Sequence, residues 1–127
     1  MIAVDTNVLV RFMTADHPAQ YRVARKLFDA DSLFIADTVL LECAWVLRKA
    51  FSYAPTTICA ALRQVCGLPN VSLRDAALVA QALDWSEAGL DFADAMHLAA
   101  AGDLSFRTFD RDLLKAGRKL GRKIAAA

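Results

Sequence analysis

The sequence contains little of what marks disordered, fibrous or disulfide-linked proteins. Of its 127 residues only five are glycine and three are proline, whereas 57% are hydrophobic, and this excludes the disordered and collagen-like classes. The three cysteines, Cys43, Cys59 and Cys66, are odd in number and have no CxxC spacing, so they predict neither a disulfide framework nor a zinc site. We expect them to be small buried residues of helices.

The sequence also shows no pattern typical of a membrane-spanning or targeting segment. The longest apolar stretches, VLLECAWVL and AMHLAAA, are too short to cross a bilayer, and the first contains a glutamate. The chain has no basic leader and reaches Asp5 before any apolar run develops, which argues against a signal peptide. We therefore expect a cytoplasmic protein without a membrane partner.

The common nucleophile and phosphate-binding motifs are missing. There is no GxSxG sequence, no glycine-rich phosphate loop, and no cysteine–histidine pair with a residue to orient it. This leaves carboxylates as the candidate chemical groups.

Charge is unevenly distributed although the net charge is only +1. Residues 75–106 contain six acids and no lysine or arginine, whereas residues 107–123 contain seven basic residues and two acids. Such asymmetry is expected of a protein that binds a polyanion next to an acidic metal centre. A solvated face of a C-terminal helix explains the basic run equally well.

Strand and helix patterns alternate along the whole chain. Short apolar strands are predicted at residues 1–4 (buried), 32–36, 70–73, 105–109 and 122–125. Helices are predicted at residues 6–14, 17–30, 37 to about 51, 55–66, 74–89, 91–102 and 110–121, with Thr6 or Asn7 capping the first and Asp37 or Thr38 the third. The pattern predicts one α/β domain over residues 1–127, with a mostly parallel sheet covered by helices on both faces.

Two acids stand where strands end. Asp5 follows the first predicted strand and Asp110 follows the fourth. The carboxyl ends of parallel strands share one edge of the sheet, where such folds bind ligands, so we expect both side chains there. Asp112 stands two residues further on, and one of the two acids is expected to cap the helix.

Two further acids stand inside apolar helices. Glu42 lies in VLLECAWVL, which predicts a buried helix, and a lone buried carboxylate needs a partner. One alternative is an ion pair with Arg48 or Lys49, which is disfavoured because they lie about two turns away, and the other is a position at the rim of the sheet. Asp94 lies in DFADAMHLAAA, one turn inside the expected helix.

The neighbours of Asp94 have ordinary explanations. Asp91, three residues earlier on the same face, suits a helix start. His97 continues the face, and a histidine on an apolar helix is more often a packing residue than a ligand.

Carboxylates that converge without a cation repel one another and raise each other's pKa values. Oxygen ligands favour Mg²⁺ or Mn²⁺ over zinc or copper. The predicted reaction is therefore the attack on a phosphodiester by a water molecule that one or two metal ions hold.

The aromatic residues are predicted to serve the fold. Phe12, Trp45 and Phe106 are interpreted as core residues rather than as base-stacking groups.

In this order, MIAVDTN, LLECAWVL, DFADAMHLAAA and TFDRDL resemble a PIN-domain ribonuclease of the VapC toxin type over nearly the whole chain. The resemblance implies a three-layer α/β/α fold with a twisted sheet of four to five strands. It also implies a metal centre of Asp5, Glu42 and Asp94, with Asp110 as a more variable fourth acid.

The resemblance extends to hydroxyl and amide side chains beside these acids. Thr6 and Asn7 match polar positions after the first acid, and Thr108 matches a hydroxyl before the last. The chain departs from the family in doubling two acids, Asp91 beside Asp94 and Asp112 beside Asp110, which leaves the fourth ligand open.

The function implied is an Mg²⁺- or Mn²⁺-dependent endoribonuclease, the toxin of a toxin–antitoxin pair. Its implied partners are RNA, a second copy of the chain in a homodimer, and a small antitoxin whose C-terminal segment crosses the toxin's groove. A catalytically silent RNA-binding or protein-docking module is the alternative. A phosphatase with Asp5 as nucleophile ranks last, because Asn7 stands where such enzymes carry a second aspartate.

Overall fold

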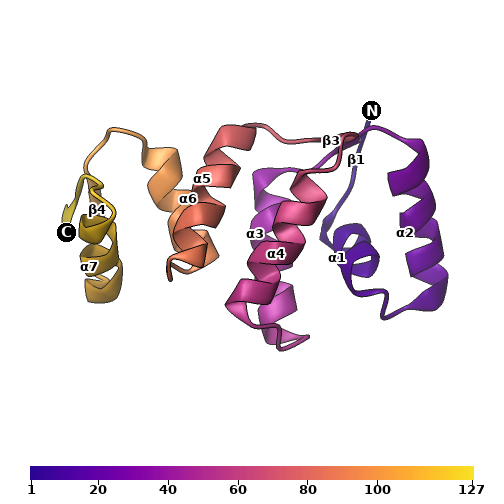
Figure 1. Ribbon diagram of the computed structural model, residues 1–127, viewed down its shortest axis with the longest axis horizontal. Helices are drawn as coiled ribbons and strands as arrows, with labels where there is room; N and C mark the ends of the chain where they lie inside the picture. Colours follow the sequence, from indigo (N-terminus) through magenta and orange to yellow (C-terminus); the bar gives the residue numbers. More distant parts are fainter. The chain divides into compact units, whose positions relative to one another are not determined.

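The computed structural model describes all residues, 1–127, as seven helices and five strands, with two helices after each of the first three strands and one between the last two (Figure 1). The chain divides into two compact units, Met1–Ala76 and Ala77–Ala127. The predicted α/β class is confirmed, and every predicted helix and strand is present.

The first unit contains a three-stranded parallel sheet. Its strands are β1 (Ile2–Ala3), β2 (Leu33–Phe34) and β3 (Val71–Ser72), in the order β1-β2-β3. Ile2 pairs with Leu33, and Leu33 pairs with Val71. Helices α1 (Thr6–Thr14) and α2 (Pro18–Ala30) connect β1 to β2, and α3 (Asp37–Lys49) and α4 (Pro55–Cys66) connect β2 to β3.

Helix α1 packs against α2 and α3, and α3 packs against α4. Leu9, Leu40, Leu47 and Leu62 of these helices, and Leu33 of β2, are out of contact with solvent. Cys43 and Cys59 are buried as predicted, and Cys66 is half-buried. Strand β1 departs from the prediction: Ile2 and Ala3 are exposed, because β1 is an end strand of this sheet, and only Val4 behind it is buried.

Polar residues join the carboxyl ends of β2 and β3. Asp37 follows β2 and Arg74 follows β3, and their side chains form an ion pair with an N–O distance of 2.7 Å. Carboxyl ends of parallel strands thus meet at one edge in this unit, as expected. Asp37 is therefore not the cap of α3; Ala36 holds that position and gives no side-chain hydrogen bond.

The second unit contains α5 (Ala76–Glu87, which begins at the boundary), α6 (Phe92–Ala101) and α7 (Arg111–Lys119), with two parallel strands. Strand β4 (Phe106–Thr108) pairs with β5 (Ile124–Ala126), and α7 packs against both. Arg122 stacks on the Trp85 ring, with its guanidinium 5.3 Å from the ring centre.

Gly117 sets the approach of α7 to β5. It is buried, and a β-carbon at this position would lie 3.0 Å from two carbons of the Ile124 side chain. Glycine therefore allows the helix to pack directly on the strand that carries Ile124.

Candidate metal and nucleic-acid site

Asp5 leaves β1 and begins α1. Its backbone is extended, and its carboxylate oxygen Oδ1 accepts the backbone N–H of Val8 at 3.1 Å. Asp5 is thus the N-cap, rather than Thr6 or Asn7, because the residue before the first helical turn has its carboxylate within reach of that turn's N–H groups. The Asp5 residue as a whole is exposed to solvent. Thr6 is buried and Asn7 is exposed in the first turn.

A groove runs between α1 and α2 beside Asp5. It has a volume of about 420 Å³. Its lining is mainly apolar, and includes Val8, Val23, Ala24 and Leu27 together with Asp5 and Asn7. The Val23 side chain is 62% exposed. The sequence patterns did not indicate this groove, because it arises from the packing of two helices.

Glu42 is exposed, and the prediction that it is buried is wrong. The buried face of α3 is formed by Leu40, Cys43, Ala44 and Leu47, and Glu42 lies off that face. Trp45, one turn further along, is 62% exposed, so its prediction as a core residue is also wrong. Glu42 forms no ion pair or hydrogen bond in the structure, and its carboxylate is free to bind a cation.

Asp91 and Asp94 stand together at the start of α6. Asp91 is the N-cap, and its carboxylate accepts the backbone N–H of Asp94 at 3.4 Å. Asp94 is therefore in the first turn, and not one turn inside the helix as predicted. His97 follows on the same helix and is exposed.

Asp94 lies in a strongly acidic environment. Partial burial raises the pKa of its carboxyl, the negative charges of Asp91 and Asp110 raise it further, and His97 opposes the rise. The effect of Asp110 shows that the start of α7 lies near the start of α6. Both burial and like charge disfavour the ionised form, and a bound cation would reverse this preference.

Asp110 is held at the end of β4 by two sets of hydrogen bonds. Its backbone N–H donates to the Thr108 hydroxyl at 2.9 Å. Its carboxylate Oδ1 accepts the backbone N–H groups of Asp112 and Leu113, at 2.9 and 3.0 Å, and so caps α7. Asp112 lies in the first turn of the helix and is exposed. Of the two acids, Asp110 is thus the cap.

The candidate acids are divided between the two units. Asp5 and Glu42 lie in the first unit, and Asp94 and Asp110 in the second. Neither unit by itself contains three or more aspartate, glutamate, histidine or cysteine side chains grouped to hold a metal ion. The second unit brings Asp91, Asp94 and Asp110 into electrostatic contact.

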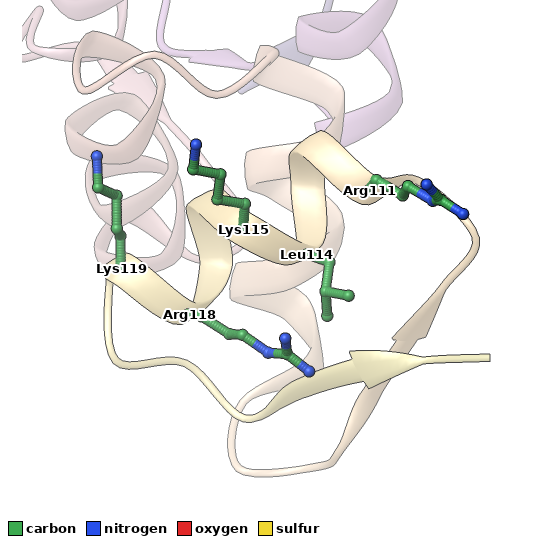
Figure 2. Close-up of a pocket in the computed structure, with 5 residues that line it drawn as sticks. All are labelled: Arg111, Leu114, Lys115, Arg118 and Lys119. Atoms are coloured by element: carbon green, nitrogen blue, oxygen red, sulfur yellow. The ribbon is translucent and has the colours of Figure 1, made fainter.

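Two features near Asp110 bear on nucleic-acid binding, and the sequence patterns indicated only the second of them, the basic segment. Phe109, assigned there to the end of a strand, is 92% exposed. Helix α7 carries four cationic side chains around a shallow hollow, Arg111, Lys115, Arg118 and Lys119, with Leu114 among them (Figure 2).

Two other aromatic residues named in the sequence analysis lie as follows. Phe12 stacks on Phe28 with ring centres 3.8 Å apart, and Phe106 is half-buried.

The fold is of the α/β class, and two of its strands, β1 and β4, run directly into helices whose N-caps are carboxylates, Asp5 and Asp110. The chain belongs to the PIN-domain family, whose family model matches residues 2–119. PIN domains are generally nucleases that use divalent metal ions, so this is a nuclease-type fold.

A search of curated proteins finds no match to this chain. None of the helices has the length and apolar character needed to cross a membrane.

Proposed function

We propose that the protein is an Mg²⁺- or Mn²⁺-dependent endoribonuclease, and that it is the VapC-type toxin of a cytoplasmic toxin–antitoxin pair. The observation that carries the proposal is the environment of Asp94, whose pKa is raised by burial and by the charges of Asp91 and Asp110. Carboxylates held together in this way are destabilising without a cation, and perturbed acids of this kind gather at functional sites.

The proposed ligands are Asp5, Glu42, Asp94 and Asp110. The donor set suits Mg²⁺ or Mn²⁺, because it offers carboxylate oxygens and no thiolate. Bound metal would supply a water of lowered pKa as the nucleophile for a phosphodiester. Caps fix the carboxylates of Asp5 and Asp110 in orientation, and Glu42 has no competing partner.

Other side chains are proposed to support these ligands. Thr108 holds Asp110 through its hydroxyl, and Asp91 holds the first turn that carries Asp94. Thr6 and Asn7 flank Asp5, and Asp112 remains the alternative fourth acid. The family match extends across both compact units, which supports a single PIN domain over residues 1–127.

Cleavage of RNA tests this function directly. Purified protein is incubated with a labelled single-stranded RNA in Mg²⁺, Mn²⁺ or EDTA. We expect metal-dependent cleavage by the wild-type chain and by Asp103→Asn, an exposed acid outside the proposed set. Asp5→Asn and Asp94→Asn should retain the fold by circular dichroism and lose cleavage. Equal cleavage by all four proteins would refute the site.

The alternative, a silent binding module, gives a different outcome. Such a protein binds RNA, leaves it intact in both metals, and gives no heat when titrated with Mn²⁺.

We further propose that an antitoxin segment occupies the groove between α1 and α2, and that the toxin forms a homodimer. The groove offers apolar Val8, Val23 and Leu27 beside the Asp5 carboxylate, which suits an apolar segment carrying one basic residue. Where a short reading frame lies directly upstream of the gene, co-expression with its product should yield a complex in which RNA cleavage is inhibited. Val23→Arg should release that partner while cleavage by the toxin alone is unchanged. Retention of the partner by Val23→Arg would place it elsewhere.

A further inference from the structure

Phe109 is held outward on a rigid turn. Its side chain is 92% exposed. The residues on either side are joined by the hydrogen bond from the Asp110 N–H to the Thr108 hydroxyl, and Asp110 in turn caps α7. The aromatic ring therefore stands in solvent on a fixed backbone, directly next to a proposed metal ligand. A large apolar side chain in this position gains nothing from the core of the protein.

Helix α7 continues from this turn with a cationic surface, formed by Arg111, Lys115, Arg118 and Lys119. All four are exposed, and none forms an ion pair or side-chain hydrogen bond. Lys115 and Lys119 extend from the helix in the same direction, and Arg118 extends along the side of Leu114 (Figure 2). From Arg111 to Lys119 the helix rises about 12 Å.

Other basic residues of the same region serve the fold instead. Arg107 donates to the carbonyl of Ala126 at 3.3 Å, and Arg122 donates to the carbonyl of Gly102 at 2.7 Å. The four cations of α7 have no such role. Lysines and arginines four residues apart on a helix repel each other by a few tenths of a kcal/mol, so their spacing weakens the isolated helix.

We propose that Phe109 stacks on a base of single-stranded RNA whose phosphates lie along the cationic surface of α7. The inference rests on the proposed function for its choice of RNA, and it adds the surface that holds the substrate. A free aromatic face next to unpaired cations is the combination that binds unpaired nucleotides: the ring stacks on a base while the cations neutralise the backbone. In duplex RNA the bases are already stacked on each other and do not offer a face.

A protein partner is the competing occupant of Phe109, and the surroundings disfavour it. The cores of protein interfaces are depleted in charged residues. Here Asp110 directly after Phe109, and Arg107 and Arg111 two residues away on either side, are charged and exposed. The other strongly exposed apolar side chain of this unit is Leu104, on the loop before β4.

Binding in EDTA tests the proposal without requiring cleavage. A labelled single-stranded RNA is titrated with the wild-type chain and with Phe109→Ala, Phe109→Leu, Phe109→Trp and the control Leu104→Ala. We expect Phe109→Ala and Phe109→Leu to weaken binding at least about tenfold, because stacking on one base contributes on that scale. Phe109→Trp should bind as tightly as wild type or more tightly, and Leu104→Ala should bind like wild type.

Two further measurements separate base stacking from phosphate contacts. With an abasic ribose-phosphate oligomer, Phe109→Ala and wild type should bind equally. Lys115→Ala should weaken binding to both oligomers and lower the slope of log affinity against log salt by about 0.7, the value for one phosphate of a single strand.

Unchanged RNA binding by Phe109→Ala would overturn the proposal. If the same variant instead alters oligomeric state by size-exclusion chromatography, Phe109 belongs to a protein interface. The nuclease function and the base-stacking role of Phe109 can be refuted independently of each other. A wild-type chain that binds RNA through Phe109 but never cleaves it contradicts the nuclease function alone. A chain that cleaves RNA while Phe109→Ala binds normally contradicts only the stacking surface.

Discussion

The carboxylate of Asp91 caps the helix turn that carries Asp94, accepting the Asp94 backbone N–H at 3.4 Å. The same contact places two negative charges side by side, and Asp110 adds a third, so that the pKa of Asp94 is raised by burial and by both neighbours. The helix cap therefore holds Asp91 and Asp94 close together although their negative charges repel each other. A bound cation would offset this repulsion.

Asp94→Asn should stabilise the metal-free protein at neutral pH while abolishing cleavage. The substitution removes one of three repelling charges and keeps a side chain of the same shape. We expect the free energy of unfolding to rise by up to about 1 kcal/mol, since Asp94 is partly exposed and solvent screens the repulsion. Urea unfolding in EDTA measures this. A loss of stability would show that Asp94 is a structural acid.

The pH dependence of that gain follows from the direction of the shift. Because the pKa of Asp94 is raised above 3.8, the folded state holds the proton more tightly than the unfolded state. The stability contributed by this proton is full below pH 3.8 and is lost as the pH rises through the folded-state pKa. Wild type and Asp94→Asn should therefore be equally stable at the acid end and diverge towards neutral pH. A difference that does not vary with pH would contradict this origin.

Glu42→Gln should leave stability unchanged, within about 0.5 kcal/mol, because Glu42 is exposed and unpaired. If Glu42 is a metal ligand, RNA cleavage should nevertheless fall roughly 100-fold or more, the scale for losing one preorganised electrostatic contact at the reacting atoms. Unfolding and cleavage are measured on the same preparation. Normal cleavage by Glu42→Gln would remove Glu42 from the site.

Gly117→Ala should destabilise the protein although alanine is the better helix former by about 1 kcal/mol. The new methyl group would lie 3.0 Å from two carbons of the buried Ile124 side chain, and overpacking of this kind typically costs about 1–3 kcal/mol. Thermal unfolding of Gly117→Ala, of Ile124→Val and of the double variant checks this. The pair should be less destabilised than the two single effects summed, and simple additivity would exclude the contact.

Native cysteines should resist alkylation. Burial, together with a smaller effect of Cys66, raises the pKa of the Cys43 thiol to about 12, and burial raises the pKa of the Cys66 thiol to about 11. Little reactive thiolate is therefore present at pH 8, and Cys66, which is half-buried, should react before Cys43. Mass spectrometry after iodoacetamide, with and without urea, measures the rates. Rapid labelling of native Cys43 would contradict its burial.

The spacing of apolar residues, together with residues that start or end helices, predicts the helices and strands of this fold well. Helices α1 and α4 match their predicted bounds, and Pro55 begins α4 as a first-turn proline. Caps were less predictable, because they depend on tertiary partners. The best example is Asp37, which pairs with Arg74 at the carboxyl end of the neighbouring strand β3 instead of capping α3.

The candidate site was predictable in residue type and order, but less so in environment. An apolar window around Glu42 suggested burial, yet a helix with apolar residues on all sides is buried only where other elements cover it, and Trp45 shows that this face is open. Likewise the sequence predicts Phe109 to be the last residue of a strand, because its neighbours in the sequence do not show whether its side chain is buried or exposed. Exposure is a property of packing between distant segments.

The central claim is that Asp5, Glu42, Asp94 and Asp110 bind a divalent cation, and calorimetric titration with Mn²⁺ tests it most directly. Wild type and the control Asp103→Asn are compared with Asp5→Asn, Glu42→Gln, Asp94→Asn and Asp110→Asn. We expect the first two proteins to bind Mn²⁺ and the last four to bind it weakly or not at all. Binding that is undiminished in all four variants, or absent from the wild-type chain, would contradict the account.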